Sequence, residues 1–62
     1  MEPIEKAKEL IKYYKGNKEG VFNDIDETLT HYSKMISKFP TDYNVKEGMK
    51  YWIDVKKEVL NY

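Results

Sequence analysis

Residues 22–39 read FNDIDETLTHYSKMISKF, and this stretch decides the fold class. Its apolar residues recur at alternating spacings of three and four, which is the period of one face of an α-helix. The lysines near its end suit the negative end of a helix dipole, and Pro40 prevents the helix from continuing. We therefore predict a packing helix over about 22–39, with Asn23 able to cap it; the alternative is a start as early as Asn17, against which Gly20 argues. Its apolar face, which Met35 widens, consists of Phe22, Ile25, Leu29, Tyr32, Ile36 and Phe39.

Two further segments have helical periodicity. The first covers about 3–15, begins at Pro3 and stops at Gly16-Asn17, which suits a helix end. The last covers about 45–61, and Asn44-x-x-Glu47 before it resembles a capping box. The connections are short, and no segment alternates as a strand does. We predict an all-α fold, a small three-helix up-down-up bundle forming one domain over 1–62. The alternative is a helical hairpin that dimerises into a four-helix bundle.

The length and composition limit what this chain can be. Its 62 residues allow at most one domain, whose core is marginal without a disulfide, a metal or self-association. There is no cysteine, and no apolar run approaches the roughly 20 residues that span a bilayer. These features predict a cytoplasmic protein with no membrane association. The preference for amino acids with AT-rich codons is compatible with a phage, plasmid or low-GC bacterial origin.

The charges argue against nucleic-acid binding. Eleven lysines balance eleven acidic residues, and the two kinds of charge are interspersed along the chain. There is no arginine. A nucleic-acid binder usually has a basic footprint rich in arginine. We therefore expect nucleic acid to be an unlikely partner. The alternative function is a small nucleic-acid-associated protein that uses the first-segment lysines Lys8, Lys12 and Lys15.

One short motif carries apparent chemistry. The run Asp24-x-Asp26-x-Thr28-Leu29 resembles the first motif of the haloacid-dehalogenase phosphatases. That resemblance implies a nucleophile at Asp24 and a general acid at Asp26. It covers about ten residues, and the motif requires a parallel sheet built from βαβ units of about 30 residues each. We instead expect these acids at a helix start, where they favour the dipole, and we predict no enzyme activity.

Metal and cofactor sites are not predicted. A calcium loop starting at Asp24 would need Gly at the position of Leu29 and Glu at the position of Met35. The single histidine, His31, has only carboxylates within reach, whereas zinc sites normally use more histidine or cysteine. We therefore predict no metal, no cofactor and no catalytic residue.

The third segment has a wider apolar arc than packing needs. Its apolar residues span about 200° of the helix, against about 140° for the segment over 22–39. Trp52 lies in the middle of this arc, as a core residue by default or as an interface hot spot. We predict a non-enzymatic protein-binding module (a regulator, inhibitor or accessory factor) that binds a protein partner or a second copy as a homodimer. The candidate interface comprises Gly48, Tyr51, Trp52, Val55, Val59 and Tyr62.

Overall fold

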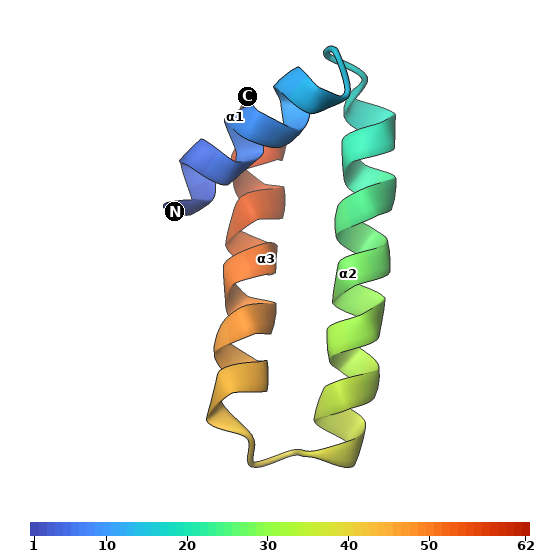
Figure 1. The fold of residues 1–62 in the computed structure, drawn as a ribbon, viewed down its shortest axis with the longest axis vertical. Coiled ribbons are helices and arrows are strands. Elements are labelled where there is room, and N and C mark those ends of the chain that lie inside the picture. The colour runs from blue at the N-terminus through green and yellow to red at the C-terminus, as the bar shows by residue number, and fades with distance from the viewer.

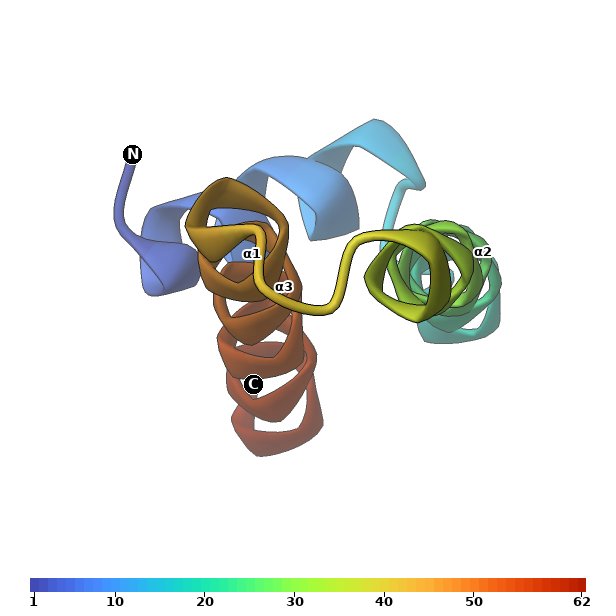
Figure 2. The ribbon, with the colours of Figure 1, turned by 90° about the horizontal axis from the view of Figure 1, so that it is seen from below.

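Three helices and no strand make up the protein in a computed structural model that describes residues 1–62. The helices are α1 (Pro3–Tyr13), α2 (Lys18–Lys38) and α3 (Tyr43–Asn61). Helices α2 and α3 form an antiparallel hairpin, and α1 crosses one face of it near the end where α2 begins and α3 finishes (Figures 1 and 2). The prediction of an all-α three-helix bundle is confirmed.

Helix α1 ends two residues earlier than the predicted boundary at 15. The backbone N–H groups of Lys15 and Gly16 turn back to the carbonyls of Lys12 and Ile11, at 3.1 and 2.9 Å. This is the Schellman arrangement, in which the residue after the cap adopts a left-handed conformation. That residue is Lys15, with φ 54°, and Gly16 follows at φ 83°. The glycine was expected to stop the helix, but a lysine occupies the strained position.

Helix α2 begins at Lys18, four residues before the predicted start at Phe22. The cap is Asn17, whose side chain accepts the N–H of Gly20 at 3.2 Å, so Asn23 lies inside the helix and caps nothing. Gly20 does not break the helix, because the ring of Tyr14 packs against it. A Cβ at Gly20 would lie 2.9 Å from that ring.

Helix α3 is also capped earlier than predicted. The carboxylate of Asp42 accepts the N–H groups of Asn44 and Val45, at 2.9 and 3.3 Å. Asn44, the predicted cap, lies in the first turn. The aspartate side chain accepts two N–H groups that have no partner within the helix, and this stabilises the helix start.

The core is concentrated at the end of the hairpin that α1 covers. One cluster there contains seven of the eight buried residues, which come from all three helices. Helix α1 packs mainly on α3 and meets α2 only near the corner between them. Toward the other end, which contains the turn between α2 and α3, only Val45 is buried. The cluster comprises Ala7, Leu10, Ile11, Val21, Ile25, Val55 and Val59.

Candidate protein-binding surface

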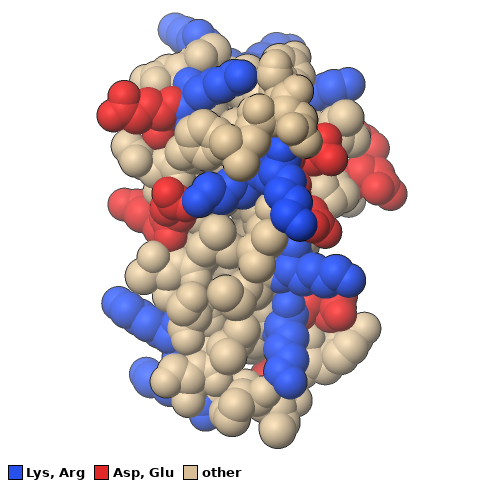
Figure 3. All heavy atoms as spheres, turned by 180° about the vertical axis from the view of Figure 1, so that it is seen from behind, with Lys and Arg blue, Asp and Glu red and all other residues tan.

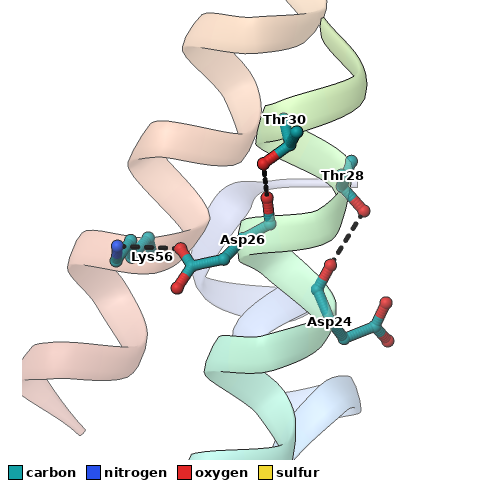
Figure 4. Close-up of polar contacts among 5 residues, drawn as sticks. All are labelled: Asp24, Asp26, Thr28, Thr30 and Lys56. Carbon is teal, nitrogen blue, oxygen red and sulfur yellow. Dashed lines mark hydrogen bonds and ion pairs between the residues drawn. The ribbon is translucent and has the colours of Figure 1, made fainter. Parts of the chain in front are cut away.

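The two aspartates of the phosphatase-like motif lie inside α2 and point to different neighbours. Positions two apart on a helix differ in direction by about 200°, and Figure 4 shows the two side chains leaving α2 on different sides. The carboxylate of Asp24 accepts the hydroxyl of Tyr14 at 2.9 Å, and that of Asp26 binds Lys56 Nζ at 2.9 Å. The expectation that these acids occupy the first turn is wrong, because the helix starts earlier. Both carboxylates instead bind side chains from the other helical segments, Tyr14 after α1 and Lys56 on α3.

The hydrogen bond from Tyr14 to Asp24 also changes the acidity of the phenol. It raises the pKa of Tyr14 above the ordinary value of 10.0, because a hydroxyl that donates to a carboxylate releases its proton less readily. Partial burial and repulsion from nearby carboxylates act in the same direction. The contact joins the end of α1 to the beginning of α2, so it stabilises the corner between them.

A shallow, open hollow lies on the outer side of α2. It is lined by Asn23, Asp26, Glu27 and Thr30, all from one helix and none apolar. Small-molecule sites are usually concave, mostly apolar and able to bury most of the ligand. The chain also places no three histidine, cysteine or acidic side chains where they could share a metal ion. The apolar surface of the molecule is therefore a better candidate for a binding site than this hollow.

Two members of the predicted interface belong to the chain's own core. Val55 and Val59 are fully buried in the cluster beneath α1. Placing them at a partner-facing surface is wrong, because α1 crosses α3 and covers this part of its apolar arc. The arc is wide at this end of α3 because two helices pack on it at different angles.

The other predicted interface residues lie at or beyond the edge of α1. Gly48 faces the ring of Tyr32, so a Cβ there would lie 2.6 Å from Tyr32 Cε1. The glycine therefore marks a close approach of α2 and α3. Tyr51 and Trp52 are half-buried and pack edge to face, with ring centroids 5.7 Å apart, and Lys6 Nζ lies 5.9 Å from the Trp52 ring. Tyr62, at the far end of α3, is 60% exposed.

A line of apolar side chains on α2 runs out from under α1. At 100° per residue, Val21, Tyr32, Met35 and Phe39 fall within an arc of about 60°. Val21 is fully buried under α1, Tyr32 and Met35 are half-buried, and Phe39 is 56% exposed. Exposure therefore increases along this one face with distance from α1.

The facing side of α3 behaves in the same way. Within an arc of about 100°, Val55 and Val59 are buried where α1 crosses. Gly48, Tyr51 and Trp52 lie in the same arc nearer the start of α3 and are half-buried. Together the two helices present a surface of aromatic and methionine side chains, which are enriched in the centres of protein interfaces. We call it the distal surface, and it consists of Tyr32, Met35, Phe39, Gly48, Tyr51 and Trp52.

The α2 part of the distal surface was missed in the sequence. The sequence pattern predicts Tyr32 and Phe39 as part of a packing face, because the apolar stripe over 22–39 is just wide enough for packing. Helix lengths could have shown the error. A helix of 11 residues is about 16 Å long and cannot cover one of 21 residues, which is about 31 Å long.

The lysines of α1 form a second exposed surface. Lys8, Lys12 and Lys15 are all exposed on and after α1, and none of them forms an ion pair within the chain. They share that surface with Glu5 and Glu9, so the positive charge is not concentrated there. None of the three helices combines the length and the apolar character required to cross a bilayer.

No protein-family model matches the chain, no curated protein matches its sequence, and no solved structure matches its fold.

Proposed function

We propose that this chain is a small, non-enzymatic protein-binding module that acts through the distal surface. The observation that supports this is the uneven coverage of the hairpin. Seven of the eight buried residues cluster where α1 crosses the hairpin, and Tyr51 and Trp52 pack against that cluster while staying half-buried. On α2, Tyr32 and Met35 are half-buried and Phe39 is exposed. A domain of this size has little core to spare, so covering these side chains would also stabilise the fold.

The occupant of this surface is either another protein or a second copy of the chain. The proposed interface no longer includes the buried residues Val55 and Val59. It keeps Gly48, Tyr51 and Trp52 from the sequence prediction and adds Tyr32, Met35 and Phe39. Tyr62 is left out because it lies at the opposite end of α3. Acting as a regulator, inhibitor or accessory factor would require no chemistry from the chain.

The test is site-specific photo-crosslinking in cells that make the protein. A photoreactive phenylalanine analogue replaces Phe39, which is 56% exposed and belongs to the distal surface. The matched control places it at Leu60, which is 64% exposed and lies near the other end of α3. We expect a discrete adduct from position 39 and none from position 60.

Sedimentation equilibrium of the purified chain identifies which occupant is present. A dimer lost on Phe39→Ser but kept on Leu60→Ser assigns the surface to a second copy. A monomer that gives an adduct at position 39 assigns it to another protein. The proposal is wrong if the chain sediments as a monomer at all concentrations and neither position gives an adduct.

A further inference from the structure

We infer that the distal surface is shaped and charged for a short amphipathic helix of another protein, with carboxylates along the edge that lies beside α2. This inference rests on the proposed function and adds the chemistry of the partner. It depends on three features of the structure: the free length of the hairpin, the composition of the uncovered face, and the charges along the α2 side.

The free length suits about three helical turns. Helix α1 occupies the position of a third helix at one end of the hairpin, and nothing continues it along the rest (Figures 1 and 2). Even if α1 lay parallel to the hairpin, its roughly 16 Å would leave about 15 Å of the roughly 31 Å of α2 uncovered, which is the length of about ten helical residues. A helix placed there would extend the coverage that α1 begins.

The composition suits a helix as the occupant. A partner helix presents apolar side chains at spacings of three and four, and these can pack on the apolar face of two neighbouring helices. Helices α2 and α3 present such a face together, because the ring of Tyr32 lies over Gly48 and the two helices approach closely there. Trp52 and Met35 lie on either side of this contact and provide large, adaptable contact area.

The charges favour an acidic partner. Along α2 there is no acidic residue after Glu27, while His31, Lys34 and Lys38 are exposed on the outer flank of the apolar line. Neither lysine forms an ion pair within the chain. The α3 flank differs, because Glu47 is exposed beside Tyr51. Carboxylates of a partner would therefore be favoured on the α2 side, where they would meet unpaired lysines.

The opposite face of the hairpin provides a matched control. Figure 3 shows that face, where lysine side chains form a column over α3. Lys46 and Lys50 belong to the same half of the molecule as Lys34 and Lys38 and are equally exposed. At 100° per residue they point about 150–170° away from the α3 part of the distal surface. By the same measure Lys38 points about 90° and Lys34 about 130° from the middle of the α2 part of the distal surface. Reversing either pair changes the net charge equally, but Lys34 and Lys38 form the nearer pair, and Lys38 borders the distal surface.

The experiment uses two stapled amphipathic peptides of about 14 residues, since unstapled helices of this length are marginal in water. Both carry the same leucine face; one has glutamates and the other lysines along one edge. Binding to the full chain is followed by the fluorescence of Trp52, the single tryptophan, which lies in the distal surface. We expect saturable binding of the acidic peptide, weaker binding of the basic one, and affinity that falls as salt increases.

The variants decide whether the site is the distal surface. The double variant Lys34→Glu/Lys38→Glu should weaken binding of the acidic peptide by roughly tenfold, whereas Lys46→Glu/Lys50→Glu should change it by less than about twofold. Equal binding of both peptides, no binding of either, or equal losses in the two double variants would overturn the inference. If only the partner's chemistry is wrong, position 39 still gives an adduct while the acidic peptide fails. If the proposed function is wrong, position 39 gives no adduct.

Discussion

The contact between Gly48 and Tyr32 leads to a quantitative prediction for Gly48→Ala. In an exposed helix interior, replacing glycine by alanine stabilises by about 1 kcal/mol. Here the new Cβ would lie 2.6–2.8 Å from three atoms of the Tyr32 ring, well inside the ordinary contact distance. The ring must move outward by close to 1 Å, and overpacking of this kind costs about 2 kcal/mol. We therefore expect a net destabilisation of about 1 kcal/mol.

The variant Tyr32→Ala removes the obstacle and changes the sign. In that background, Gly48→Ala should stabilise the helix by about 1 kcal/mol, so the coupling between the two positions is about 2 kcal/mol. Urea denaturation of the four proteins, followed by helical circular dichroism, measures each free energy of unfolding. A chain of this length has about 3–9 kcal/mol of stability, which leaves room for the single variants. If Gly48→Ala stabilises the wild-type chain, the close approach is not a constraint and the reasoning fails.

Three further predictions concern the helix ends and the corner between α1 and α2. Asp42→Ala should lower the free energy of unfolding by about 1 kcal/mol in urea, whereas Asn44→Ala should change it by less than about 0.5; a larger effect at Asn44 would contradict the observed cap. Lys15→Gly should raise stability by about 0.5–1 kcal/mol, because glycine adopts the left-handed conformation at φ 54° without strain; an unchanged urea midpoint would argue against this. The pKa of Tyr14 is raised by its hydrogen bond to Asp24, so this phenol contributes stability that is fully present below pH 10 and is lost as pH rises through the folded value. Stability should therefore fall more steeply above pH 10 in the wild-type chain than in Tyr14→Phe, and equal slopes would refute the contact.

Helix content was predictable because it depends on local properties. The spacing of apolar residues over 22–39 predicted α2, Pro40 predicted the stop after it, and Pro3 predicted the start of α1. The helix ends were less predictable, because several residues can cap and the choice depends on neighbours. Asn17 caps α2, and the ring of Tyr14 packs over Gly20 in the same turn, which is a contact between two helical segments. From the sequence pattern alone, Gly20 would be expected to weaken a helix that includes it.

The candidate surface was predicted only in part. The sequence indicated a wide apolar arc on the third segment, and Tyr51 and Trp52 of that arc are only half-buried. It also placed Val55 and Val59 at the surface and Phe39 in ordinary packing, whereas the two valines are fully buried and Phe39 is 56% exposed. The error has one origin, which is that helical periodicity reports which face of a helix is apolar but not which part of that face is covered.

By itself, the sequence determined that this chain forms three amphipathic helices without disulfides, because periodicity, breakers and composition act within each segment. Only the tertiary structure decided where the apolar surface is left over. Helix α1 is too short to follow the hairpin and crosses it at one end, where it completes the core. The side chains beyond that crossing are covered on one side only, and their exposure depends on distances between helices that no single segment specifies.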